Sequence, residues 1–172
     1  MDENLLQQLE AYLKETYQEP QFQGYAQMAP SPARQRSKEQ TTVSSTNNEY
    51  NQLELNLPPL EDTFAAQLLK LIRLKGKEEA EVYKKANIDR RLFSKIRTNN
   101  DYTPSKATIL ALIFALELET SEAADLLKRA GYCLSRSQKG DVIVHFFLKN
   151  HIYDLFTVQE ALAHYGLKMP GN

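Results

Sequence analysis

Basic and hydroxyl side chains gather on one side of the segment from residue 90 to residue 98. They follow the i, i+1, i+4, i+5, i+8 spacing of a single helix face, with one further cation at its edge. The set is Arg90, Arg91, Ser94, Lys95, Arg97 and Thr98. Guanidinium groups pair bidentately with phosphate and with guanine, and ammonium and hydroxyl groups donate to the same acceptors. The pattern therefore predicts a helix with a donor-rich surface for nucleic acid.

The chain lacks the residue patterns of an enzyme or a metal site. His145, His151 and His164 are too irregularly spaced for a helical metal pair, and Cys133 is the only cysteine. All six glycines are isolated, so they form no glycine-rich phosphate loop. Nucleophile motifs and paired catalytic carboxylates are also missing. The sequence predicts a non-enzyme without a cofactor or a metal.

Two short helices joined by a tight turn would position the donor-rich surface. Each helix has an apolar side, formed by Ala80, Val82, Tyr83 and Ala86 in the first and by Leu92, Phe93 and Ile96 in the second. At the turn, Asn87 tolerates the left-handed backbone conformation and Ile88 is suited to anchor the turn in the core. We expect Asp89 to cap the second helix, because its carboxylate can accept open backbone N–H groups.

This stretch resembles the helix-turn-helix of Xre-type, lambda-repressor-like DNA-binding domains. The resemblance rests on Ala86-Asn87-Ile88-Asp89 at the turn, on Phe93-Ser94-Lys95-Ile96 in the second helix and on Pro104 after it. It extends from about Phe64 to Tyr132, with Asn87 in place of the usual Gly. Similar segments with added C-terminal helices are appended to bacterial macrodomain-type proteins. The resemblance implies that residues 90–98 enter the major groove of duplex DNA while Lys84, Lys85 and Lys106 contact phosphates.

The distribution of charge agrees with a nucleic-acid surface but permits other interpretations. Residues 64–106 carry 11 basic and 5 acidic side chains, whereas the preceding 63 residues carry 4 basic and 10 acidic ones. Positive charge is thus concentrated on the helix-turn-helix, as a phosphate-contacting surface requires. A solvated basic face and a surface for an acidic protein remain as alternatives.

We expect an all-α fold. Residues 61–132 would form a lambda-repressor-like five-helix bundle, in which one helix begins at Thr103-Pro104 and the next at Thr120. Residues 133–172 would form a helical extension that packs on this bundle and either enlarges its core or provides a homodimer surface. Within the extension, residues 141–150 fit a helix or a strand, and residues 157–160 fit the capping box of a last helix.

The N-terminal part of the chain is predicted to be an amphipathic helix, residues 1–17, on a linker. The apolar side of the helix consists of Leu5, Leu6, Leu9, Tyr12 and Leu13. Residues 18–60 are rich in Gln, Ser, Thr, Asn and Pro, which predicts a flexible linker followed by an extended arm. A helix this short needs a partner surface, which is its own domain, a second copy or another protein.

Two functional hypotheses follow. The first is a DNA-binding regulator, and the alternative is a protein-interaction adaptor that uses the helix-turn-helix as a platform and captures its partner with the N-terminal helix or the extension. We expect a cytoplasmic protein that does not bind membranes. The first residues are acidic and lack a signal-peptide pattern, and the sequence has no apolar run of the roughly 18 residues that a membrane span needs.

Overall fold

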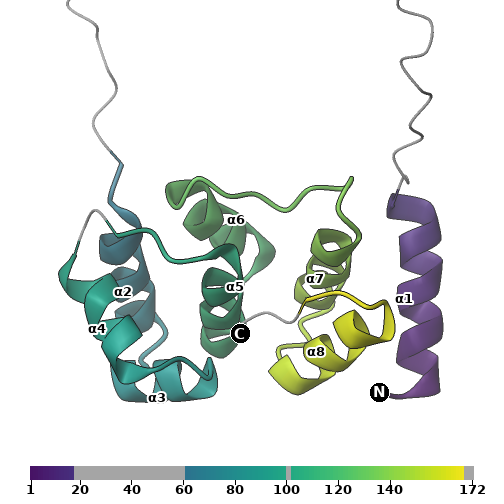
Figure 1. Cartoon of the computed structure of the whole chain (residues 1–172), viewed down its shortest axis with the longest axis horizontal. Coiled ribbons are helices and arrows are strands. Elements are labelled where there is room, and N and C mark those ends of the chain that lie inside the picture. Colours follow the sequence, from purple (N-terminus) through teal and green to yellow (C-terminus); the bar gives the residue numbers. More distant parts are fainter. Residues whose placement is uncertain (18–60, 100–101, 169–172) are drawn as a thin grey trace, which may run out of the picture. The chain divides into compact units, whose positions relative to one another are not determined.

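The computed structural model describes residues 1–17, 61–99 and 102–168. These residues form eight helices and no strand, which confirms the all-α class (Figure 1). The helices are α1 (Glu3–Thr16), α2 (Phe64–Leu74), α3 (Glu79–Lys85), α4 (Arg90–Thr98), α5 (Lys106–Leu116), α6 (Thr120–Arg129), α7 (Lys139–Lys149) and α8 (Leu155–His164). None of them is long and apolar enough to cross a membrane. The linker and arm expected at residues 18–60 lie outside the described residues.

Helix α5 is the central element of the hydrophobic core. Every residue from Ile109 to Leu116 is buried, so the helix has no solvent-facing side over this stretch. It packs against α3, α6 and α8, which come from both the bundle and the extension (Figure 1). A helix that is apolar all round is stable only when other helices surround it. The remaining helices therefore have to turn their apolar sides toward α5 or toward each other.

Residues 141–150, for which the sequence left helix and strand open, are helical. The buried residues of α7 are Asp141, Val142, Ile143, Val144, Phe146, Phe147 and Leu148. Helices α1, α6 and α8 pack on α7, which explains why a helix with three consecutive β-branched residues is buried on several sides. The apolar residues of α7 belong to the same hydrophobic core cluster as the buried apolar residues of α2–α6. The extension therefore enlarges the core.

The start of α5 differs from the sequence prediction. Ser105 is the N-cap and accepts the N–H of Thr108 at 3.2 Å, so the helix begins at Lys106. Thr103 and Pro104, predicted as N-cap and first helical residue, precede the helix. That prediction was wrong because Ser105 is an equally good cap and lies closer to the buried residues of the helix.

The start of α8 was also predicted incorrectly. The carboxylate of Asp154 accepts the backbone N–H of Thr157 at 2.9 Å and its hydroxyl at 2.6 Å. Thr157 is therefore inside the first turn of α8 and does not cap it. The aspartate three residues upstream thus accepts the Thr157 N–H, which the Glu160 side chain would have accepted in a capping box at residues 157–160. Helix α6 begins at Thr120, and its N-cap, Glu119, forms a capping box with Glu122.

Helix α1 docks on the chain's own α7, which was one of the alternatives left open for it. Leu9 and Leu13 are buried there, and Leu5, Leu6 and Tyr12 are partly buried. The Tyr12 hydroxyl lies 2.8 Å from Nδ1 of His145, and the N-terminal amine of Met1 pairs with Glu160 of α8. The apolar residues expected to capture another protein are therefore covered by the chain itself.

We predict that Phe147→Ala lowers the free energy of unfolding by about 3–5 kcal/mol, because it removes a fully buried ring and leaves a cavity. Phe156→Ala is the matched control, since the Phe156 side chain is 71% exposed and its loss should change stability by less than about 0.5 kcal/mol. Urea unfolding followed by circular dichroism measures both. Equal effects of the two substitutions would show that α7 is not part of the cooperative core.

We also predict that stability decreases when His145 is protonated. Burial, together with the charges of Lys149 and Arg136, lowers the pKa of His145. The unfolded chain therefore binds this proton more readily than the folded one. The contribution of neutral His145 is complete above the ordinary histidine pKa of about 6.5, and it is lost as the pH falls through the lowered folded-state value.

Urea midpoints measured between pH 5 and pH 8 test this prediction. The decrease toward low pH should be smaller in His145→Gln than in the wild type. His164→Gln, which replaces an exposed histidine, is the matched control. A profile unchanged by His145→Gln would contradict the prediction.

Candidate nucleic-acid interface

Helix α4 has one buried side and one exposed side, as its sequence predicts. Phe93 is 3% exposed and Ile96 is fully buried, and both face the core between α2 and α3. Arg90, Arg91 and Lys95 are exposed on the remaining surface of the helix. The two buried side chains prevent the helix from rotating, so the direction of the cations is set by apolar packing.

The turn between α3 and α4 has the predicted structure. Asn87 has a φ of 54°, in the left-handed region, and Ile88 is 8% exposed. The N–H of Ile88 donates to the carbonyl of Tyr83 at 2.8 Å, which closes the end of α3. The Asp89 carboxylate accepts the N–H of Arg91 at 2.7 Å and caps α4. Tight local hydrogen bonds thus set the direction in which α4 leaves the turn.

Four of the predicted cations are exposed without an acidic partner among the described residues: Lys84, Arg90, Arg91 and Lys95. Lys84 lies in the last turn of α3, while Arg90 and Arg91 lie in the first turn of α4. The turn therefore has uncompensated positive charge on both sides. An anionic ligand approaching the start of α4 would meet these groups without having to displace a carboxylate.

The other predicted basic residues are held by groups on neighbouring elements. Arg97 pairs with Glu79 of α3 at 3.1 Å, and Lys85 pairs with Glu117 at the end of α5. Hydrogen bonds from Lys85 and Lys77 to Glu117 lower the pKa of that carboxyl group. Both pairs are solvent-exposed, so each contributes no more than about 1 kcal/mol to stability. They orient the cations but would yield to a phosphate at little cost.

Lys106 is less suited to phosphate contact than the sequence suggested. Its Nζ lies 2.6 Å from the buried carboxylate of Asp141 on α7. Removing Lys106 from this carboxylate would leave a buried negative charge without an opposite charge beside it, which is costly. Lys106 therefore connects α5 to α7, and it is the weakest of the nine predicted nucleic-acid-binding residues.

The polar groups of α4 make contacts that the sequence did not indicate. The Lys95 ammonium lies 3.9 Å from the centre of the Tyr102 ring, a cation–π contact that orients an exposed side chain. The Thr98 hydroxyl donates to the carbonyl of Ser94 at 2.9 Å, within the helix. Tyr102 follows α4 after a loop, and no residue pattern signals that its ring would return to Lys95.

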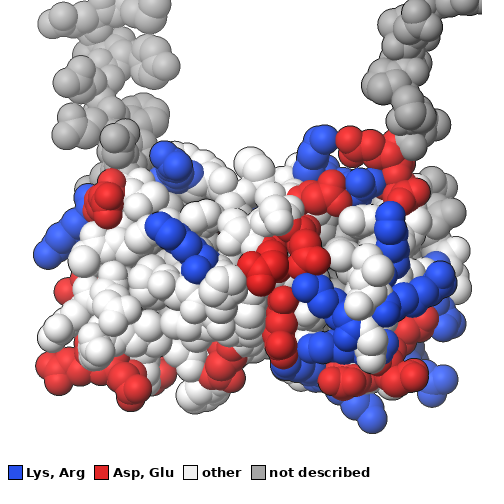
Figure 2. All heavy atoms as spheres, turned by 180° about the vertical axis from the view of Figure 1, so that it is seen from behind, with Lys and Arg blue, Asp and Glu red and all other residues white. Residues whose placement is uncertain are grey.

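The basic surface also contains acidic side chains. Figure 2 shows more Lys and Arg on the side of α2–α4 than on the side of α1, with Asp and Glu among them. The surface is thus mixed in charge, and its cations without an acidic partner include those at the turn and at the start of α4. In the described part of the chain, no group of three or more His, Cys, Asp or Glu residues is arranged to hold a metal ion.

Comparisons with protein-family models, with curated protein sequences and with solved structures give no match for this chain. The geometry of the turn and of the two helices beside it is therefore the basis for a proposed function. Its main elements are the buried side of α4 and the free cations at its N-terminal end.

We predict that two substitutions of Asn87 at the turn have different effects on stability. Asn87→Ala should lower the free energy of unfolding by about 1 kcal/mol, because a β-carbon without a polar side chain is strained at positive φ. Asn87→Gly should leave stability unchanged or raise it by up to about 1 kcal/mol, since Gly adopts this conformation without strain. Chemical denaturation of both variants provides the comparison. An alanine variant as stable as the glycine variant would mean that the turn is not left-handed.

Proposed function

We propose that this chain binds duplex DNA through α3 and α4, with α4 in the major groove and α3 across the sugar-phosphate backbone. The observation that carries the proposal is the exposed, unpaired state of Arg90 and Arg91 in the first turn of α4. In helix-turn-helix docking, the N-terminal residues of the second helix reach the base edges. Two guanidinium groups at that end are suited to bidentate pairing with guanine.

The arrangement of α2–α6 supports this proposal. We propose that these five helices form a bundle of the lambda-repressor type, as the resemblance of the sequence to Xre-type domains implies. The support consists of the helix order, the short left-handed turn at Asn87 and the buried side of α4. In this arrangement α5 supports the pair α3–α4 from behind, because it packs on α3.

The remaining basic and hydroxyl residues would have supporting roles. Ser94, Lys95 and Thr98 would contact bases or phosphates along α4. Lys84, Lys85 and Arg97 would neutralise the backbone, the last two after exchanging an exposed carboxylate for a phosphate. A single small module makes few contacts, so a second copy or a tethering partner would be needed for high affinity. We propose a regulator that works in the bacterial cytoplasm, where the DNA is located.

The alternative, a protein-interaction adaptor, has less support. Its capture helix would be α1, but Leu9 and Leu13 are buried against α7 and would have to undock before they met another protein. Among the described residues, the large apolar side chains that remain exposed are Leu74 and Phe156, on two different helices. Such isolated residues are normal on protein surfaces and do not define an interface.

We predict that the chain shifts duplex DNA and that log affinity falls linearly with log salt, by about 0.9 per phosphate contacted. Arg90→Ala together with Arg91→Ala should abolish sequence preference, since each bidentate arginine contributes about 1–3 kcal/mol of base discrimination. Selection from a pool of random duplexes, followed by fluorescence anisotropy on enriched and scrambled duplexes, measures both effects.

The matched control is Lys14→Ala together with Lys168→Ala, which removes two exposed positive charges from α1 and from the residues after α8. This control should keep the enriched sequence. Intact sequence preference in the double arginine variant would rule out docking by the start of α4. A wild-type protein that shifts no duplex at micromolar concentration and low salt would favour the adaptor.

A further inference from the structure

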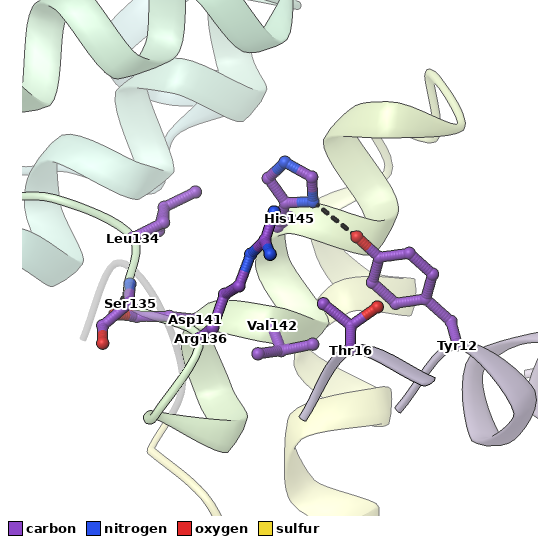
Figure 3. A pocket seen from close by; sticks show the side chains of 8 residues that line it. All are labelled: Tyr12, Thr16, Leu134, Ser135, Arg136, Asp141, Val142 and His145. Atoms are coloured by element: carbon purple, nitrogen blue, oxygen red, sulfur yellow. Dashed lines mark hydrogen bonds between the residues drawn. The ribbon is translucent and has the colours of Figure 1, made fainter. Parts of the chain in front are cut away.

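A pocket of about 130 Å³ lies between α1, the segment that precedes α7, and α7 itself (Figure 3). Its apolar walls include the Tyr12 ring, Leu134 and Val142, and its polar groups include Arg136, Asp141 and His145. The space is larger than a single water needs. The pocket exists only while α1 is docked, because Tyr12 forms one of its sides.

The pocket has one acidic group, and its charge is already compensated. Asp141 is 8% exposed, and its Oδ2 accepts the Lys106 ammonium at 2.6 Å and the backbone N–H of Ser135 at 2.9 Å. These contacts hold the carboxylate in place beneath the segment that carries Arg136. Asp141 is therefore a structural group of the pocket and is not available to neutralise a further cation.

Positive charge in the pocket, by contrast, is not compensated. Arg136 is exposed to solvent and has no acidic partner among the described residues. Lys149 does not line the pocket, but its ammonium lies 5.4 Å from the centre of the Tyr12 ring. Both cations act on His145 and lower its pKa, as burial also does. His145 already shares a hydrogen bond with the Tyr12 hydroxyl at 2.8 Å. Of the charged residues that line the pocket, Arg136 is thus the one without an ionic partner in the described part of the chain.

We infer that this pocket binds a small organic carboxylate, with the Arg136 guanidinium on the carboxylate and the apolar body against Leu134, Val142 and the Tyr12 ring. Arginine suits this ligand because its planar fork donates two parallel hydrogen bonds to a carboxylate. The predominance of apolar walls favours an organic anion over inorganic phosphate. Arg136 comes from the segment before α7 and Tyr12 from α1, so the anion would connect α1 to the rest of the domain.

This inference does not depend on DNA binding, and it has a physical consequence. A ligand that binds only when α1 is docked stabilises docking by RT ln(1 + [L]/Kd). The carboxylate would therefore control how often α1 leaves α7. The site is far from α4 in the sequence, and its residues are not among those proposed to contact DNA.

Isothermal titration calorimetry with sodium benzoate on the full chain tests the site. We expect saturable binding with one benzoate per chain, and binding at least about tenfold weaker in Arg136→Gln, equivalent to about 1.4 kcal/mol. Lys168→Gln is the matched control, since it removes one exposed positive charge outside the pocket and should bind like the wild type. Circular dichroism confirms that both variants are folded.

Hydrogen exchange supplies the readout for α1. Benzoate should slow the exchange of the amides of residues 3–16 in the wild type and leave them unchanged in Arg136→Gln. The proposal is overturned if millimolar benzoate gives no saturable heat, if Arg136→Gln binds as tightly as the wild type, or if inorganic phosphate binds as tightly as benzoate. Binding of benzoate without slower exchange in α1 would overturn the coupling.

Discussion

The burial of Phe93 and Ile96 is the constraint on which the arrangement of α3, the turn and α4 depends. With these two side chains in the core, α4 has only one orientation about its axis, and Arg90, Arg91 and Lys95 have to face solvent. The short turn adds a second constraint, because the left-handed Asn87 and the cap at Asp89 set where the helix begins. Apolar packing on the buried side of α4 thus determines which side chains lie on the exposed side, the surface that is proposed to read DNA.

The charges around this surface fall into two groups with different energetics. The cations at the turn have no carboxylate to give up, whereas Lys85 and Arg97 share exposed ion pairs with Glu117 and Glu79. Exposed pairs of this kind contribute little to stability, and their main effect is to restrict the side chains. They also keep neighbouring helices in register, since Glu79 lies on α3 and Glu117 follows α5. Glu79 and Glu117 therefore form ion pairs with Arg97 and Lys85 that can break at little cost in stability.

The residues beyond α6 are an integral part of the fold. Helix α7 is buried on several sides and contacts α6, α8 and α1, so the core would be incomplete without it. Helix α1 is the outermost of these elements. Leu9 and Leu13 are buried, Leu5 and Tyr12 also pack on the core, and the Tyr12–His145 hydrogen bond and the pair between the Met1 amine and Glu160 add polar contacts. A ligand in the adjoining pocket would act on the docking of this helix directly, because Tyr12 lines that pocket.

The sequence by itself determined the features that depend on neighbouring residues. These are the all-α class, the two sides of α4, the turn at Asn87 and the cap at Asp89, all of which follow from helical periodicity and local hydrogen bonding. Where two local signals competed, the sequence was insufficient, as at Ser105 and Asp154, because the choice of cap depends on which residues the core buries. Only the tertiary structure decided that α1 docks on α7, that residues 141–150 are helical, and which group meets each cation. Lys95 with Tyr102, Arg97 with Glu79 and Lys106 with Asp141 come from separate elements, and a one-dimensional pattern carries no information about distances across a folded core.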